Sequence, residues 1–226
     1  YIPYMKGYFT SLGKFSSDDV KTGDILAYTG STSSAVYFPD TVELESDSYP
    51  IDYLIRNAPV MKDGERVKVQ QGAGMAVTKS DEEHEYAAGV FLKWFTQKEQ
   101  NLRFVCESSY MPVLKEANSV DELDSVIREN KIEINQKVYD CFAAEMKDFG
   151  KTDFYTPESF DNSYSARKIL EYSLSDRASA DKKALNETIE SGETKEEALT
   201  RYLTDDNFES WYAQFCDALE QAVTAR

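Results

Sequence analysis

The spacing of apolar positions divides the chain into an irregular first third and a helical remainder. Up to about residue 80, short apolar runs are interrupted by Gly, Pro and Ser. Runs of this kind predict strands bounded by turns. We expect strands over residues 25–29, 53–56, 67–69 and 75–78, and a short helix after residues 30–34 that stops before Pro39.

From Ser80 onward the apolar residues recur at three- and four-residue spacing, which predicts helices. A Ser or Thr stands three residues before a Glu at several points, and this pairing predicts a capping box at the start of a helix. The pairs are Ser80 with Glu83, Thr96 with Glu99, Ser119 with Glu122, and Thr194 with Glu197. Further helix starts are expected at Thr156–Pro157 and within residues 161–164.

Two aromatic stripes fall on single helical faces, and such stripes usually pack into a core. The first comprises Ala87, Phe91, Trp94 and Phe95; the second comprises Phe208, Trp211, Tyr212, Phe215, Leu219, Ala222 and Val223. No internal repeat and no flexible linker interrupts the pattern. We therefore predict one domain over residues 1–226, of a helix-rich α/β class with a small mixed sheet.

Composition adds limits on partners. Hydrophobic residues make up 41% of the chain, which is enough for a packed core. The formal net charge of −16 repels nucleic-acid phosphates and anionic membranes, and no basic patch offsets it. The longest apolar run, residues 86–92, is too short to span a membrane. Because the chain opens on Tyr1 without a methionine, we expect a mature form or an excised piece.

Metal and cofactor chemistry find little support in the sequence. The three cysteines, Cys106, Cys141 and Cys216, have no zinc or redox spacing and are expected to be small buried hydrophobes. The single histidine, His84, lies in an acidic run expected to be the exposed first turn of a helix. We therefore expect no metal, no cofactor and no catalytic residue.

Three loops are candidates for ligand contact. Gly30–Ser34 would present hydroxyls and backbone N–H groups at a helix start, Gln71–Gly74 would allow a close backbone approach, and Ser108–Val113 carries Tyr110. The plainer interpretations are a serine-rich cap, an ordinary glycine turn and a packed hinge tyrosine. The candidate residues are Ser31, Thr32, Gly72 and Tyr110.

Arg167 is a further candidate because it follows a predicted helix start by only a few residues. The helix dipole disfavours a cation there, so the position would suit an anion held jointly by Arg167 and free N–H groups. The alternative is a surface arginine paired with Glu171, four residues on.

Several of these segments occur in an order and spacing that resemble the family 1 extracellular solute-binding proteins, including the maltose- and glycerol-3-phosphate-binding type. They are Gly30-Ser31-Thr32, Gln71-Gly72 before Met75-Ala76-Val77, the phrase from Phe91 to Thr96, and Ser109-Tyr110-Met111-Pro112-Val113. The likeness is strongest over residues 24–113. It departs from the family at Ser109, where many relatives have glycine before the tyrosine.

The resemblance implies one lobe of a type II periplasmic binding protein fold, the C-terminal lobe, with most of the N-terminal lobe absent. It implies that Ser31, Thr32, Gly72 and Tyr110 face a ligand cleft, and that Arg167 is similar to an arginine that contacts phosphate in glycerol-3-phosphate binders. The implied partners are a small-molecule solute and the permease subunits of an ABC importer. The implied location is extracellular or periplasmic, with a lipoprotein anchor on the parent protein.

A neutral sugar is the solute that we expect, and a phosphorylated polyol such as glycerol-3-phosphate is the alternative. Two other classes stay open from the residues alone. A carbohydrate-active enzyme domain would need two facing carboxyl groups. A helical interaction scaffold would need a continuous exposed apolar groove.

Overall fold

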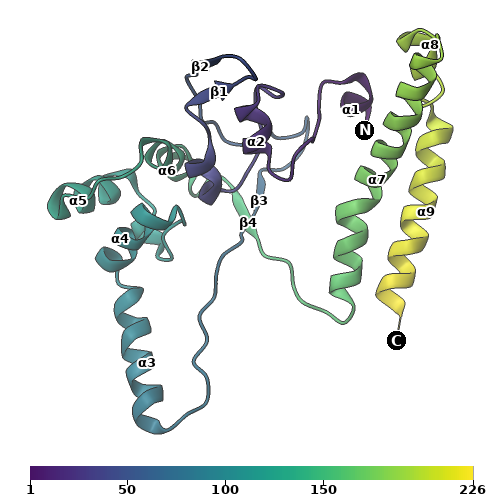
Figure 1. Cartoon of the computed structure of the whole chain (residues 1–226). Helices are drawn as coiled ribbons and strands as arrows, with labels where there is room; N and C mark the ends of the chain where they lie inside the picture. The colour runs from purple at the N-terminus through teal and green to yellow at the C-terminus, as the bar shows by residue number, and fades with distance from the viewer. Residues whose placement is uncertain (226) are drawn as a thin grey trace. The chain divides into compact units, whose positions relative to one another are not determined.

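The computed structural model describes residues 1–225, which form two compact units (Figure 1). Unit 1 comprises Tyr1–Leu12 and Glu158–Arg226, and unit 2 comprises Gly13–Pro157. Each unit is described by itself. A lobe can contain more than one compact unit, so the expectation of one domain over residues 1–226 stays a prediction.

Unit 2 is helix-rich with very short strands. Its helices are α2 (Ser16–Lys21), the 3-10 helix η1 (Thr32–Tyr37), α3 (Glu82–Phe95), α4 (Lys98–Ser108), the 3-10 helix η2 (Lys115–Ala117), α5 (Val120–Asn130) and α6 (Gln136–Asp148). Strands β1 (Thr41–Glu43) and β2 (Ser48–Pro50) pair antiparallel, and β3 (Val67–Val69) pairs parallel with β4 (Asp153–Tyr155). Helices hold 54% of the chain, which confirms the helix-rich class, although the pairs form two separate sheets.

The core of unit 2 lies between α4, α5 and α6. Leu102 and Val105 from α4 are buried against Leu123 from α5 and Phe142 from α6. Residues that recur every three or four positions on each helix supply this cluster, as the periodicity predicts. Its full buried membership is Leu102, Val105, Cys106, Ala117, Leu123, Val126, Val138, Phe142 and Met146.

A second face of α6 is polar and holds the irregular part of unit 2. Lys137 donates to the Phe38 carbonyl at 2.6 Å, and the Tyr53 hydroxyl donates to Asp140 at 2.8 Å. About two turns further along α6, Asp148 accepts a hydrogen bond from Asn57 at 2.7 Å.

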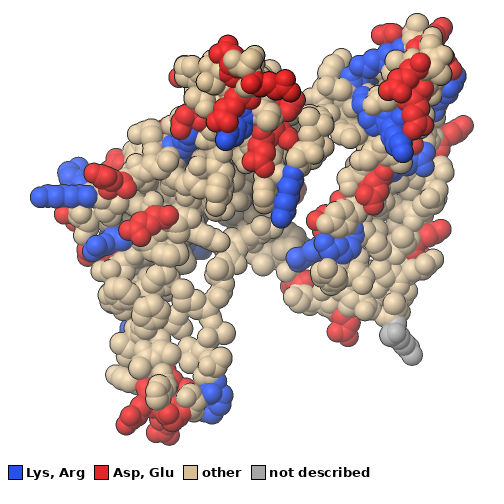
Figure 2. All heavy atoms as spheres, viewed as in Figure 1, with Lys and Arg blue, Asp and Glu red and all other residues tan. Residues whose placement is uncertain are grey.

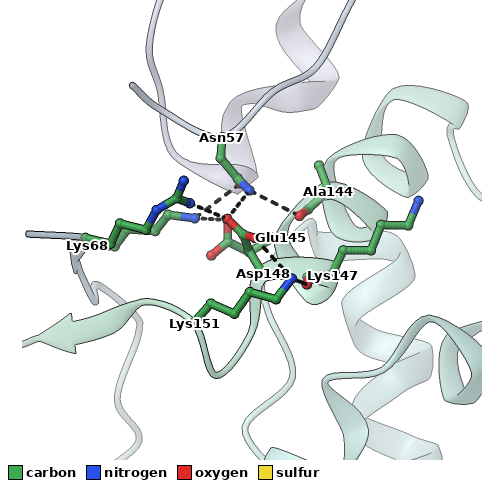
Figure 3. A network of polar contacts seen from close by, with 8 residues as sticks. Asn57, Lys68, Ala144, Glu145, Lys147, Asp148 and Lys151 are labelled. Atoms are coloured by element: carbon green, nitrogen blue, oxygen red, sulfur yellow. Dashed lines mark hydrogen bonds and ion pairs between the residues drawn. The ribbon is translucent and has the colours of Figure 1, made fainter. Parts of the chain in front are cut away.

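The same face continues to the end of α6 (Figure 3). Lys68 pairs with Glu145 at 2.6 Å, and Arg66 pairs with Asp148 at 3.1 Å. We call the five α6 residues Lys137, Asp140, Ala144, Glu145 and Asp148 the polar ladder. They lie on one helical face because they follow each other at one, three or four positions.

The strands predicted at 25–29, 53–56 and 75–78 do not form, and the polar ladder gives the reason for residues 53–56. The chain around Tyr53 is irregular, but α6 side chains hold it where a neighbouring strand would otherwise do so. Only the strand predicted at 67–69 is confirmed, as β3, because a parallel partner, β4, reaches it from beyond α6.

The predicted helix starts of unit 2 are confirmed to within a residue. The N-cap of α3 is Asp81, whose carboxylate accepts from the His84 N–H at 2.9 Å, one residue after the predicted Ser80. Ser119 caps α5 without a side-chain bond. The N-cap of α4 is Gln97 and not Thr96, because the Thr96 hydroxyl donates back to the Leu92 carbonyl at 2.9 Å.

The prediction that the α3 stripe is core is wrong for this structure. No residue of α3 is buried, and Trp94 remains 46% exposed. Phe91 stacks on Phe95, which meets Phe104 of α4 edge-on at 5.0 Å. The aromatic side chains therefore cover one another at the α4 end of the helix, while the remaining face packs on no large apolar surface among residues 1–225.

Unit 1 contains α1 (Ile2–Lys6), α7 (Ser163–Glu190), α8 (Lys195–Leu199) and α9 (Asp205–Thr224). Met5, Leu185 and Ala198 form its small buried core. Lysines from the neighbouring helices satisfy the last carbonyls of α1: Lys182 donates to Met5 at 2.8 Å and Lys195 donates to Lys6 at 2.9 Å. The predicted capping box of Thr194 and Glu197 is confirmed at the start of α8.

A polar network ties α1 to the two long helices of unit 1. The Tyr1 hydroxyl donates to Asp181, which also accepts from Arg177 at 2.7 Å. Asn207 of α9 donates to the Tyr1 hydroxyl at 3.0 Å and accepts from Arg177. Four side chains from three segments therefore satisfy one another's hydrogen-bonding groups in a half-buried site.

One further prediction for unit 2 and one for unit 1 need correction. The helix expected at Thr156–Pro157 does not form, because the Thr156 hydroxyl donates to the Gln70 carbonyl and keeps the chain extended beyond β4. The alternative start within residues 161–164 is confirmed by α7. The α9 stripe is only half-buried, with Phe208 53% exposed, because the two-helix pair of α7 and α9 has one contact face.

The three cysteines differ in burial. Cys106 is buried as predicted, Cys141 is half-buried, and Cys216 is exposed, which corrects the expectation for that residue. Within residues 1–225, every helix is too short or too polar to cross a lipid bilayer.

We predict that Lys137→Met lowers the free energy of unfolding by about 1–3 kcal/mol, because the half-buried Phe38 carbonyl loses its donor. The measurement is urea unfolding followed by circular dichroism. Lys147→Met, at an exposed position of the same helix, is the control and should change stability by less than about 0.5 kcal/mol. Equal effects of the two substitutions would contradict the role of Lys137.

A second prediction concerns Asp181. Burial raises the pKa of Asp181, but hydrogen bonds from Tyr1 and Arg177 outweigh burial and leave that pKa below its ordinary value. A carboxyl whose folded pKa is depressed stabilises the fold above the unfolded value of about 3.9, and this contribution is lost as the pH falls through the folded pKa.

Asp181→Asn should therefore lower the thermal midpoint of unfolding at neutral pH. The difference in midpoint between the variant and the wild-type chain should become smaller below about pH 4. Asp176→Asn, at an exposed position of the same helix, provides the control. A gap for Asp181→Asn that is constant from neutral to acid pH would contradict this assignment.

Candidate functional site

The loop before η1 is a cluster of hydroxyl groups. Ser31 is the N-cap of η1 and is exposed, and its hydroxyl lies 2.9 Å from that of Ser33. The Ser34 hydroxyl donates to the Ser31 carbonyl at 2.7 Å and closes the turn. The half-exposed Thr32 hydroxyl has no hydrogen-bond partner within residues 1–225, so it is available to a ligand.

Tyr28 is a residue of this loop that the sequence did not single out. Its half-buried ring stacks on Phe38 at 5.9 Å. Burial raises the pKa of Tyr28, and a hydrogen bond with Ser34 opposes that rise. An aromatic ring beside several hydroxyls could have signalled a sugar-type site in the sequence, where Tyr28 stands two residues before Gly30.

Gly30 is required by close packing and not by its backbone angle. A Cβ at this position would lie 2.5 Å from the Ser34 hydroxyl and 3.3 Å from the Tyr28 ring. The glycine therefore lets the chain pass between the two side chains that shape the loop.

Tyr110 lies just after α4, at a turn that is held from inside. Ser109, the C-cap, is buried and has a left-handed φ of 62°. Glycine reaches this angle without strain, which explains why glycine at this position is compatible with the same turn. Asn101 accepts from the Val113 N–H at 2.9 Å, so the turn is fixed while the Tyr110 ring stays 42% exposed.

The two loops border the same core. Ala35 of η1 and Met111, next to Tyr110, both pack against the cluster formed by α4, α5 and α6. Lys137 adds a second tie, because it binds the Phe38 carbonyl directly after η1. The structure thus brings Ser31, Thr32 and Tyr110 to the periphery of one core.

Among the described residues of unit 2, no hydrogen bond or ring contact joins Gly72 to those loops, and Arg167 belongs to unit 1. Gly72 lies in the irregular segment between β3 and α3, and a Cβ there would meet no atom within 4 Å. Arg167 belongs to unit 1, on the second turn of α7, and is exposed.

The alternative expectation paired Arg167 with Glu171, but in the structure Glu171 pairs with Lys168 at 3.0 Å. The pKa of Glu171 is lowered, chiefly by its hydrogen bond from Lys168, with a smaller contribution from the charge of Arg167. Among residues 1–225 Arg167 makes no hydrogen bond or ion pair, so its guanidinium is available.

Sequence reasoning missed two hollows in unit 2. One, of about 550 Å³, is lined by α3 and the segment before it, at Met75, Ala76, Val77, Thr78, Ser80, His84, Ala88, Phe91 and Leu92. The other, of about 300 Å³, lies between residues 57–68 and the end of α6. Both are assembled from segments distant in sequence or without a motif, so no local pattern could reveal them.

Charge does not single out a strongly anionic or cationic site. On the face shown in Figure 2, acidic side chains gather over the β1–β2 hairpin and around the start of α3. The segments 30–34 and 108–113 contain no charged residue. Within residues 1–225, no group of three or more His, Cys, Asp or Glu residues is arranged to hold a metal ion.

We predict that Gly30→Ala destabilises unit 2 by about 1 kcal/mol, because the new methyl group displaces the Ser34 hydroxyl from the Ser31 carbonyl. Gly72→Ala is the matched control and should change the free energy of unfolding by less than about 0.5 kcal/mol, since its Cβ enters open space. Chemical unfolding of both variants checks the pair. Equal losses would contradict the packing described around Gly30.

Comparison with known proteins supplies the family. Residues 3–130 match the family model described as bacterial extracellular solute-binding protein. No curated protein and no solved structure matches the chain. The matched range covers more than half of the 226 residues and contains Ser31, Thr32, Gly72 and Tyr110, whereas Arg167 lies beyond it. The helix-rich structure with small sheets is consistent with one lobe of such a protein, and the chain belongs to the family of bacterial extracellular solute-binding proteins.

Proposed function

We propose that this chain binds a carbohydrate without transforming it, as the recognition component of an ABC importer. Family membership indicates a solute-binding component of ABC transport that works in an extracellular or periplasmic location. One observation carries the carbohydrate assignment: the exposed ring of Tyr110 and the hydroxyl groups of the 30–34 loop border the same core.

The chemistry of these groups suits a neutral sugar. An aromatic face covers the apolar C–H side of a sugar ring, while hydroxyl and backbone groups exchange hydrogen bonds with its hydroxyls. No charged side chain lies in either loop, so neither loop supplies an ion pair that would select an anion or a cation. The overall charge of −16 also disfavours an anionic solute at long range.

A catalytic role is not part of the proposal. Glycoside hydrolysis uses two carboxyl groups at the scissile bond. Neither the 30–34 loop nor the 108–113 turn contains an Asp or a Glu. These two segments therefore offer recognition chemistry without the acid and base of a carbohydrate-active enzyme.

A phosphorylated polyol such as glycerol-3-phosphate is the second candidate, and Arg167 supports it. The Arg167 guanidinium makes no ion pair among the described residues, and the first turn of α7 contains no acidic residue to repel a phosphate. Arginine binds phosphate through two parallel N–H donors. Under this alternative Arg167 would bind the phosphate of the solute.

The remaining parts of the proposal concern partners. The loaded protein would dock on the transmembrane permease subunits of the importer, and a lipid anchor on the parent protein would hold it near them. These partners follow from the transport role and not from a surface identified on unit 1 or unit 2.

We predict that saturation-transfer NMR detects binding of a neutral sugar such as maltose, and that Tyr110→Ala weakens it by about three- to tenfold through loss of ring contact. Tyr8→Ala, at an exposed tyrosine of unit 1, should leave the affinity unchanged. A panel that also contains glycerol-3-phosphate separates the two solutes. If the chain binds glycerol-3-phosphate and Arg167→Ala abolishes that binding, the phosphorylated polyol replaces the sugar as the assigned solute. If no carbohydrate in the panel binds, the sugar assignment is wrong.

A further inference from the structure

The 300 Å³ hollow between residues 57–68 and the end of α6 contains an unsatisfied buried hydroxyl. Thr152 is only 8% exposed, lines this hollow, and its hydroxyl has no hydrogen-bond partner within residues 1–225. A buried hydroxyl without a partner is unfavourable for folding, so such a group requires an explanation. A ligand that bonds to Thr152 would remove this cost.

The backbone around Thr152 is firmly placed. Gly150 turns the chain after α6 with a left-handed φ of 86°. The Asp153 N–H then donates to the Arg66 carbonyl at 3.0 Å, directly before the parallel pair of β3 and β4. Thr152 is therefore fixed opposite Arg66, among the residues that line the hollow.

Several of the polar groups around the hollow are already paired with one another (Figure 3). Asn57 uses its amide on Asp148, on the Ala144 carbonyl and on Lys68. Asp148 accepts from both Asn57 and Arg66 through one oxygen, and its other oxygen lies 3.7 Å from Lys151.

Two cations at the hollow still have N–H groups to offer. Lys68 donates to Asn57 and Glu145, which leaves one of its three N–H groups. Arg66 has one partner, Asp148, which leaves most of its five donors. These donors and the Thr152 hydroxyl call for an acceptor-rich group such as a carboxylate.

The charges and the apolar side chains that line the hollow restrict the class of ligand further. The lining side chains of Arg66 and Lys68 are balanced by those of Glu65 and Asp148, so the lining has no net charge. Within residues 1–225 the Glu65 carboxylate makes no hydrogen bond or ion pair, and it can receive an ammonium group. The remaining wall is largely apolar, at Ala58, Pro59, Val60, Met61 and Val67.

We propose that this hollow binds a small zwitterion with an aliphatic side chain, such as a free aliphatic amino acid. Its carboxylate would accept from Arg66 and Thr152, its ammonium would face Glu65, and its side chain would lie on the Val60–Met61 wall. The size of the hollow is at the lower end of the range for small-molecule sites. None of Ser31, Thr32, Gly72 and Tyr110 lines it, so this proposal does not depend on the carbohydrate assignment.

The test is an NMR titration of the full chain with L-leucine, beside isocaproate, which lacks the ammonium, and isoamylamine, which lacks the carboxylate. We expect L-leucine to bind, with both analogues weaker. Thr152→Val keeps the side-chain size, removes only the unsatisfied hydroxyl, and should weaken L-leucine about tenfold or more. Thr10→Val, at an exposed threonine of unit 1, is the control.

Glu65→Gln serves as the second variant, because Glu65 is exposed and its substitution leaves the core intact. It should weaken L-leucine up to about fivefold, and should not weaken isocaproate. Glu83→Gln on α3 is its control. Three results would each overturn the proposal. L-Leucine binds Thr152→Val as tightly as the wild-type chain, or isocaproate binds as tightly as L-leucine, or L-leucine causes no shifts.

Discussion

The polar ladder of α6 is the constraint on which the rest of unit 2 depends. The segment from residue 38 to residue 69 contributes one buried apolar side chain, Val42, and three short strands, so it cannot hold itself in place by packing. Charged and polar side chains of α6 bind it at successive points instead, from Lys137 at Phe38 to Asp148 at Arg66. Because its opposite face packs into the core through Phe142, α6 joins the two halves of unit 2.

This arrangement has a direct consequence for solute recognition. Lys137 fixes the chain directly after η1, and Ala35 places η1 against the core that also supports the turn of Tyr110. Hydroxyls and an aromatic ring that are distant in sequence are thereby supported by the same three helices. Rigid support of this kind lowers the ordering cost of binding, which matters for a sugar that offers few apolar contacts.

Much of the helical half was predictable from the sequence, because its signals are local. Apolar periodicity and N-cap residues placed α3, α5 and α8 within about a residue, and the Gly30–Ser34 loop was recognised from its composition. The structure corrects the strands predicted around residues 25, 53 and 75, and around residue 53 the stabilising partners are α6 side chains. No local pattern encodes a hydrogen bond between Tyr53 and Asp140, which are 87 positions apart.

The candidate site likewise has residues that local sequence signals predict and residues that they do not. Ser31, Thr32 and Tyr110 follow from loop chemistry and the family likeness, whereas Tyr28 and the Thr152 hollow depend on long-range packing. The aromatic stripe of α3 shows the limit of periodicity: the pattern predicts a helix with an apolar face, but it cannot say that another element covers that face.

The most direct test of the account is a ¹H–¹⁵N NMR titration of the chain with maltose that follows the backbone amides individually. If one solute contacts both loops, the amides of residues 30–34 and of Tyr110 will shift together along a single saturation curve. Shifts in only one of the two loops, or shifts confined to α3 or to unit 1, would contradict it.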